Sequence, residues 1–359
     1  MKEPTGRAVT EMDNEARVVI FGLGPLGVAI AKAILDKKGM KIVGAVDIAK
    51  DISGKDLGEV LNLGKSLGVT VTSDGEALLG RVKADIAVVA TKSSVKDIHP
   101  QLALCARNEV DVISTCEELS YPYYRYPELS KEIDALAKKH GVTILGTGIN
   151  PGYLMDALPI TLTGACLRVD KVTVTRMMDS SKRRIPFQKK IGTGLTTEEF
   201  AKKIREKIIT GHVGLTESIA MIASALGWKL SEIKEFPPEP FIAEKQIVTP
   251  YVTVKPGYVT GLKSAAHGIK DTKPVIVLEF FAHAGVEEEY DAISIEGVPN
   301  LNQKIIGGVH GDVGTVAVIL NMIPKVLNAQ PGLATMKDLP LPSVLNEDLR
   351  VYLHPTNRF

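Results

Sequence analysis

A glycine cluster that directly follows a short apolar run most constrains the fold. Residues 17–21 are typical of a strand buried on both faces, and residues 28–35 have the apolar stripe of a helix. Glycines between such a strand and helix allow a tight turn, so that backbone can approach a diphosphate at the helix N-terminus. We therefore predict a dinucleotide site at Gly22, Gly24, Pro25, Leu26 and Gly27.

Asp47 extends this dinucleotide pattern. It lies twenty residues after Gly27, at the end of a second predicted strand over 41–46. An acidic side chain at this position accepts hydrogen bonds from the adenosine ribose and repels a 2′-phosphate. Asp47 therefore favours NAD as the cofactor, whereas Lys50 leaves NADP possible.

The order of predicted strands and helices indicates two folded units. Strands at 69–72, 85–90, 110–114 and 142–145 alternate with helical stretches that include 57–67, which is typical of an α/β fold with a doubly wound parallel sheet of the Rossmann type. From residue 167 onward, strand-like runs such as 245–255 dominate and predict an α+β domain with an open mixed sheet. We expect a polar extension (1–15), a Rossmann domain (16–148), a substrate and dimerisation domain (149–310), and a C-terminal helix and tail that return to the Rossmann domain (311–359).

Composition excludes several classes of protein. The formal net charge of +1 offers no surplus for phosphate binding, which argues against nucleic acid as a partner. No apolar run approaches the roughly 20 residues that span a bilayer, and no signal peptide is visible, so we expect no membrane partner and a cytoplasmic protein. Three scattered cysteines, and histidines without metal-ligand spacing, predict no metal site.

Two further loops are candidates for cofactor contacts. Thr91, Lys92 and Ser93 follow the strand at 85–90, where ligands of a parallel sheet bind, and they suit a nicotinamide ribose or the diphosphate. The alternative is that they only cap the following helix. Asn150 offers both a donor and an acceptor to a nicotinamide carboxamide or to a substrate, although Asn-Pro-Gly is also an ordinary turn.

An acidic pair supplies the candidate catalytic residues. Glu117 and Glu118 follow the strand at 110–114, where a carboxylate could bind a cation or take a proton. Alternatively, both are acidic residues favoured at a helix start. A single histidine such as His212 is more often structural than a ligand, and Asp312 has an explanation as a helix cap.

Longer motifs carry a resemblance to a known family. From about Ala16 to Pro342 the chain resembles 2,4-diaminopentanoate dehydrogenase and related native amine dehydrogenases, on the motifs GLGPLG, STCEELSYP, GTGINPGYLMDALP, GHVGLTES and GGVHGDVGTVAVILNMIPKVLNAQPGLATMKDLP. The resemblance implies an NAD(P)-dependent enzyme that deaminates a primary amine oxidatively, or aminates a ketone with ammonia in reverse. It places the catalytic role on Glu117 or Glu118, with Glu117 favoured.

The resemblance also bears on the substrate and on the alternatives. Arg176, Lys182, Arg183 and Lys190 are candidate partners for a substrate carboxylate, although the residues near Arg183 could be a solvated loop, and we predict substrate binding by Arg176 and His310. A dihydrodipicolinate-reductase-like cyclic imine reductase is the main alternative, but that group's histidine pair is missing here. A nucleotide-sensing protein without catalysis is a second alternative. We expect a homodimer, because open mixed sheets often pair across a face.

Overall fold

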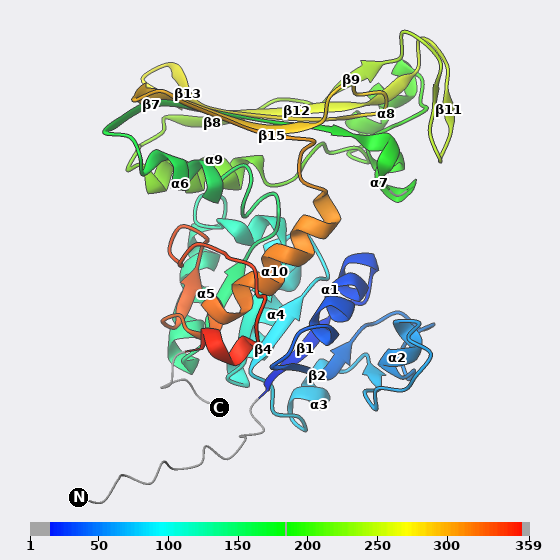
Figure 1. Ribbon diagram of the computed structural model, residues 1–359, viewed down its shortest axis with the longest axis vertical. Helices are drawn as coiled ribbons and strands as arrows, with labels where there is room; N and C mark the ends of the chain where they lie inside the picture. The colour runs from blue at the N-terminus through cyan, green and yellow to red at the C-terminus, as the bar shows by residue number, and fades with distance from the viewer. Residues whose placement is uncertain (1–14, 184, 354–359) are drawn as a thin grey trace, which may run out of the picture.

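Two sheets organise the computed structural model, which describes residues 15–183 and 185–353 (Figure 1). The predicted extension over 1–15 lies outside these residues except for Glu15, as does the end of the tail. The first sheet is parallel, and its strands lie in the order β16-β6-β5-β4-β1-β2-β3. Their bounds are β1 (Ala16–Phe21), β2 (Met40–Val46), β3 (Val71–Thr72), β4 (Ile86–Val89), β5 (Asp111–Ser114), β6 (Thr143–Gly146) and β16 (Gly332–Ala334).

Helices cover both faces of this sheet. Because successive side chains of a strand point to opposite faces, Val18 and Ile20 of β1 pack in the cluster that contains Ile30 of α1, whereas Val19 and Phe21 pack in the cluster that contains α4 and α5. The bounds are α1 (Pro25–Leu35), α2 (Leu57–Val60), α3 (Gly75–Leu79), α4 (Val95–Arg107), η1 (Glu117–Ser120) and α5 (Pro127–His140). The strand order changes direction between β1 and β4, which confirms the predicted Rossmann-type α/β fold.

The second sheet is mixed, as the sequence predicts. Its order is β15-β14-β7-β13-β12-β8, with β9 also paired to β12; β7 and β13 are parallel, and the other pairs are antiparallel. The strands are β7 (Arg168–Asp179), β8 (Glu232–Glu235), β9 (Glu239–Ile242), β12 (Val259–Lys270), β13 (Lys273–His283), β14 (Tyr290–Val298) and β15 (Leu301–Ile306). Its inward side chains, such as Val174 and Leu278, pack against α9.

The remaining elements of the second unit lie mostly between the two sheets or at one end of the mixed sheet (Figure 1). They are α6 (Ala157–Thr163), η2 (Ser180–Lys182), α7 (Ile185–Lys190), α8 (Thr197–Arg205), α9 (Leu215–Ala225) and the hairpin of β10 (Ile247–Val248) with β11 (Thr253–Val254). In Figure 1, α6 and α9 lie under the mixed sheet and face the Rossmann domain.

The chain crosses between the two units twice. Residues 147–156 lead from β6 to α6, and α10 (Gly311–Leu327) runs back from the mixed sheet to pack against α1, β5 and β6 (Figure 1). After α10, β16 pairs with β6, and η3 (Leu349–Tyr352) follows. Both crossings pass the carboxyl end of β6, so this edge of the parallel sheet faces the second unit.

Two local predictions are wrong. The helix expected over 57–67 ends at Val60, because Asn62 (φ 54°) and Gly64 (φ 68°) turn the chain into the left-handed region. The backbone then folds around Asp56, whose carboxylate accepts hydrogen bonds from Leu67 and Gly68. The strand-like run at 245–255 is the hairpin of β10 and β11 rather than one strand.

Candidate active site

The three glycines of the loop before α1 have different surroundings. A Cβ on Gly22 (φ 93°) would lie 2.5 Å from the carbonyl oxygen of Ala90, and one on Gly27 would lie 1.9 Å from that of Gly22. A Cβ on Gly24 would meet no atom within 4 Å. The first and third glycines are therefore required by the protein's own packing, whereas the second leaves open space beside the backbone. A diphosphate needs such a cradle at a helix N-terminus.

The charge at the start of α1 also suits an anionic group. Gly24 caps the helix without a side-chain hydrogen bond, Pro25 follows at its first turn, and that turn has no acidic residue. The positive end of the helix dipole is therefore not neutralised by the chain itself. Leu26, the next residue, lines the cleft described below.

Asp47 lies against the same glycine loop. One carboxylate oxygen accepts a hydrogen bond from the backbone N–H of Leu23 (2.6 Å), and the other accepts one from Ala49 (2.8 Å). An ionised carboxylate has about four acceptor positions, so two remain for ribose hydroxyls. The residues present thus fit a dinucleotide along the carboxyl ends of β1 and β2.

A cleft of about 300 Å³ separates the Rossmann domain from the second unit. It lies at the carboxyl ends of β5 and β6, where ligands of doubly wound sheets bind. The side chains and backbone around it come from both units and from the two crossings; they include Leu26, Thr115, Glu117, Thr147, Asn150, Arg176, Arg183, Phe187, Lys190, His212, Phe280, Asp312 and Thr315.

The structure separates the two adjacent glutamates. Glu117 lines the cleft, and its carboxylate makes no hydrogen bond or ion pair with the described residues. Glu118 points to the start of α4, where one oxygen accepts from the N–H of Val95 (2.9 Å) and the other from the hydroxyl of Tyr126 (3.0 Å). Glu118 therefore has a structural partner at each oxygen and does not line the cleft, whereas Glu117 is available to a ligand.

Asn150 and His212 meet at the wall of the cleft. The Nδ2 of Asn150 lies 2.9 Å from the Nε2 of His212 and 3.0 Å from the sulfur of Met155. The His212 ring stacks on Phe280 at a centroid distance of 4.4 Å. Burial, together with the charges of Arg176 and Lys190, lowers the pKa of His212 to about 3, so the ring is neutral near pH 7. The sequence favoured a structural role for His212 and did not predict its position in the cleft.

Arg176 is buried and also borders the cleft. Its Nη2 donates to the carbonyl oxygen of Val309 (2.5 Å), and its Nη1 lies 3.4 Å from Oδ1 of Asp291. Neither Nη1 nor that Oδ1 has a hydrogen-bond partner among the described residues. Burial lowers the pKa of Arg176 and raises the pKa of Asp291, and the pair opposes both shifts.

Arg183 and Asp312 differ from the sequence-based expectations. Arg183 does not lie in a solvated loop: its side chain is 9% exposed, and it forms an ion pair with Asp312 (2.9 Å) beside the cleft. Asp312 is not the cap of α10. The N-cap is His310, whose Nδ1 accepts from the N–H of Val313 (3.4 Å).

The remaining predicted residues lie around the cleft rather than in it. His310 is exposed and lines a neighbouring cavity of about 140 Å³, which Arg176 also borders. The hydroxyl of Thr91 donates to Gln101 (2.8 Å), and Lys92 and Ser93 are exposed. This loop does adjoin the glycine loop, since the carbonyl of Ala90 lies against Gly22.

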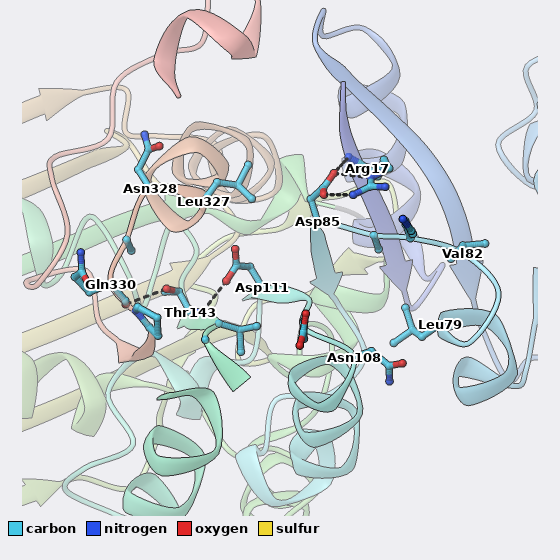
Figure 2. A pocket seen from close by; sticks show the side chains of 17 residues that line it. Arg17, Leu79, Val82, Asp85, Asn108, Asp111, Thr143, Leu327, Asn328 and Gln330 are labelled. Carbon is cyan, nitrogen blue, oxygen red and sulfur yellow. Dashed lines mark hydrogen bonds and ion pairs between the residues drawn. The ribbon is translucent and has the colours of Figure 1, made fainter. Parts of the chain in front are cut away.

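A larger cavity of about 560 Å³ lies at the opposite edge of the parallel sheet, and Figure 2 shows its side chains. Its polar groups bind one another: Arg17 pairs with Asp85 (2.6 Å), and Asp111 accepts from the N–H of Thr143 (2.6 Å). It lies at the amino ends of the strands, away from the glycine loop. The cleft, and not this larger cavity, is therefore the candidate active site.

Within residues 15–183 and 185–353, no group of three or more His, Cys, Asp or Glu side chains could hold a metal ion. In the same part of the chain, no helix has the length and apolar character needed to cross a bilayer.

A glycine loop at the switch point of a parallel sheet, joined through a cleft to a mixed-sheet unit, defines a two-domain, nucleotide-binding oxidoreductase. Residues 16–144 match the family described as dihydrodipicolinate reductase, N-terminus, and residues 153–355 match that of the 2,4-diaminopentanoate dehydrogenase C-terminal domain. The chain belongs to the 2,4-diaminopentanoate dehydrogenase family, which confirms the resemblance found in the sequence.

Individual relatives agree along nearly the whole chain. The 2,4-diaminopentanoate dehydrogenase of Acetoanaerobium sticklandii is 36% identical over 94% of this chain and 97% of its own length. The amine dehydrogenase of Streptomyces virginiae is 24% identical over 90% and 96%. The structure of amine dehydrogenase from Mycobacterium smegmatis aligns with a TM-score of 0.81 and 29% identity, over 93% of this chain and 99% of that one. The protein is therefore a dehydrogenase whose fold takes NAD(P).

Proposed function

We propose that this protein oxidises the side-chain amine of a diamino acid such as 2,4-diaminopentanoate to a ketone and ammonia, and catalyses the reverse amination. One observation carries the proposal: a carboxylate without a protein partner, Glu117, shares a cleft with a buried arginine, Arg176. The first suits a reacting amine, and the second suits a carboxylate on the same substrate.

Glu117 performs the proton chemistry in this proposal. A bound nicotinamide cofactor supplies the hydride acceptor for the amine-bearing carbon. The negative charge of Glu117 stabilises the iminium that forms on the substrate, and the same carboxylate then takes a proton from the water that attacks the iminium carbon. The resulting carbinolamine loses ammonia as its C–N bond breaks. The balance is amine, water and oxidised cofactor to ketone, ammonia, reduced cofactor and one proton.

Arg176 and Asp291 recognise the amino acid end of the substrate. A buried guanidinium whose Nη1 has no hydrogen-bond partner among the described residues suits the substrate carboxylate. Oδ1 of Asp291, which lies 3.4 Å from that Nη1 at the neighbouring cavity and also has no hydrogen-bond partner there, suits the α-ammonium group. Arg183 and Lys190 add positive charge along the cleft. An amino acid substrate offers a carboxylate to Arg176 and an α-ammonium group to Asp291, whereas a simple amine offers neither group.

NAD is the proposed cofactor. The carboxylate of Asp47 lies at the glycine loop, where it accepts hydrogen bonds from ribose hydroxyls and repels a 2′-phosphate. This preference for NAD over NADP is tested by the Asp47 variant described in the Discussion.

The test of the function follows NADH formation with 2,4-diaminopentanoate and with pentan-2-amine, which has the same reacting carbon but lacks the amino acid end. We expect kcat/KM to be at least about 100-fold higher for the diamino acid, equivalent to about 2.7 kcal/mol of recognition. The double variant Arg176→Met, Asp291→Leu removes both charges that recognise the amino acid end, so it should lose most of this preference. It should still fold, because neither buried charge is left unpaired.

Each result has a defined meaning. Equal kcat/KM for the two amines would contradict the role of Arg176 and Asp291 and favour a plain amine dehydrogenase. NADH binding without turnover of any amine would favour a nucleotide-sensing protein. Reduction of dihydrodipicolinate without amine turnover would favour the cyclic imine reductase.

We further propose a cytoplasmic homodimer. The mixed sheet supports this proposal, because α6 and α9 cover one of its faces while the other carries no helix among the described residues (Figure 1). Sedimentation equilibrium tests the dimer: a single species of about 39 kDa, the monomer mass, would contradict it.

A further inference from the structure

The side-chain amide of Asn150 has one end fully occupied and the other unpaired. Its Nδ2 carries two hydrogens, and two acceptors lie close to it: the Sδ of Met155 (3.0 Å) and the Nε2 of His212 (2.9 Å). Its Oδ1 is buried and has no hydrogen-bond partner among the described residues. Asn150 lines the cleft, so the amide is left with an acceptor for a ligand.

His212 is itself held firmly. Its backbone N–H donates to the hydroxyl of Ser264 on β12 (3.0 Å), and its ring stacks on Phe280 of β13. The loop that contains His212 also contacts the crossover of residues 147–156 at a second point. Gly214 (φ 108°) would place a Cβ 2.5 Å from Pro151, so only glycine allows this approach. The loop before α9 and the Asn-Pro-Gly crossover therefore form one unit across the boundary between the two domains.

The tautomer of His212 determines which end of the Asn150 amide is available. An amide Nδ2 can only donate, so with Nδ2 facing Nε2 the ring nitrogen accepts and the neutral ring carries its proton on Nδ1; a proton on Nε2 would require the flipped amide. A flipped amide would place Oδ1 against the sulfur of Met155, which is a repulsive contact, and against Nε2, which is repulsive when the ring proton is on Nδ1. The ring thus holds the amide in one of its two orientations.

We propose that His212 is a positioning residue, which holds the Asn150 amide so that its Oδ1 accepts a hydrogen bond from an N–H group of the reacting pair. The inference rests on the proposed function. Two N–H donors share this chemistry: the carboxamide of the nicotinamide ring, and the ammonium or iminium group of the substrate. The acceptor accordingly serves an N–H donor at the place where the two reactants meet.

Matched substitutions test the role of the ring acceptor. His212→Phe keeps the stack on Phe280 but removes the acceptor, and His212→Gln restores an acceptor near the position of Nε2. We expect His212→Phe to raise the Kd for NADH or the KM for the amine by about 10- to 100-fold, the cost of a misplaced buried hydrogen bond. His212→Gln should recover most of that loss. His283→Phe is the control, because His283 stacks similarly on Phe241 (4.1 Å) but does not line the cleft.

A cofactor analogue separates the two donors. The acetylpyridine analogue of NAD has a methyl ketone in place of the carboxamide and therefore lacks its N–H. If the carboxamide is the donor, wild type and His212→Phe should bind this analogue equally. If the amine is the donor, NADH binding should be unchanged and the difference in amine KM should persist with the analogue. In either case, His212→Phe should have no further effect in an Asn150→Ala background, because the two residues act as one unit.

The tautomer can be measured without turnover. In ¹⁵N NMR spectra of the histidine side chains, the His212 signal, identified by its loss in His212→Gln, should report a proton on Nδ1. In Asn150→Asp, where a carboxylate oxygen replaces the donor, the proton should move to Nε2. These spectra also test the proposal if His212→Phe does not fold. They stand apart from the proposed function, whose tests are the turnover of amines by wild type and its preference for the diamino acid.

Three results would overturn the inference. They are a wild-type His212 with its proton on Nε2, a His212→Phe variant with Kd and KM values within twofold of wild type, and a His212→Gln variant no better than His212→Phe.

Discussion

The two walls of the cleft are built on different principles. The cofactor wall is the proposed dinucleotide site, where the backbone at Gly22, Gly24 and Gly27 sets the shape and Asp47 closes the end. Its Leu26 lines the cleft itself. The proposed substrate wall uses side chains from distant segments: Asn150 pairs with His212, and Arg176 pairs with Asp291 of the neighbouring cavity. Backbone recognition suits a cofactor that many enzymes share, whereas in the proposed function paired side chains provide the selectivity for one substrate.

The largest expected effect is at the point where the two walls meet. Glu117→Gln keeps the size of the side chain but removes the charge and the proton acceptor. We expect turnover to fall by about 10²–10⁴, the range of a positioned acid–base group, with the Kd for NADH nearly unchanged. Steady-state kinetics with a matched NADH titration check both expectations.

Glu118→Gln is the matched control for this prediction. The Glu118 carboxylate accepts from Val95 at the start of α4, so its loss should cost about 1 kcal/mol in the free energy of unfolding and leave turnover within about threefold. If Glu118→Gln lowered turnover more than Glu117→Gln, the assignment of the catalytic carboxylate would be reversed.

The second prediction compares two glycines of the cofactor wall. Gly27→Ala places a Cβ 1.9 Å from the carbonyl oxygen of Gly22, and we expect it to lower the free energy of unfolding by about 3 kcal/mol. Gly24→Ala meets no protein atom within 4 Å, so it should change that free energy by less than about 1 kcal/mol and yet weaken NADH binding at least about tenfold.

Urea unfolding and NADH titration of both variants separate packing from binding. Tight NADH binding by Gly24→Ala would show that the diphosphate does not approach this glycine. A fully stable Gly27→Ala would contradict the close packing of α1 on the loop.

The contrast between the walls also explains what the sequence could predict. Glycine spacing after a buried strand is local, so the Rossmann fold and its loop are recognisable from residues 17–47 alone. The helix predicted over 57–67 ends early because Asn62 and Gly64 adopt left-handed backbone conformations. The apolar pattern of this segment resembles that of a helix and does not reveal those turns. The three-residue strand β16 has little periodicity of its own and is defined by its pairing with β6.

The substrate wall was harder to predict because its members meet only in three dimensions. Glu117 and Glu118 are adjacent in sequence, and only the position of the α4 N-terminus distinguishes them. His212 is 62 residues from Asn150, so no spacing rule connects them. A usable signal did exist: His212 is flanked by Gly211 and Gly214, both with positive φ, as expected of a loop that approaches another backbone closely.

A third prediction concerns the selectivity of the cofactor wall. Asp47→Ala removes a ribose acceptor and a charge that opposes a 2′-phosphate, so the ratio of kcat/KM for NAD to that for NADP should fall about tenfold. Asp51→Ala is a suitable control, because this exposed carboxylate lies near Asp47 in sequence and has no predicted ribose contact. An unchanged ratio in Asp47→Ala would remove Asp47 from the cofactor site.

The last prediction concerns the pH dependence that His212 adds to stability. The pKa of His212 is about 3 in the folded protein, against about 6.5 in an unfolded chain. Above pH 6.5 both states are neutral at this ring and it contributes nothing. As the pH falls below 6.5, the unfolded chain takes up a proton that the folded protein does not, so the free energy of unfolding decreases until about pH 3.

Between pH 7.5 and pH 5, this proton should cost wild type about 1–2 kcal/mol that His212→Gln does not lose. Urea unfolding of both proteins at the two pH values gives the difference directly. His267 and His283, whose pKa values burial also lowers, are present in both proteins and cancel. Identical pH slopes would mean that His212 can be protonated in the folded protein, and its lone pair would then be unable to hold Asn150 against the cleft.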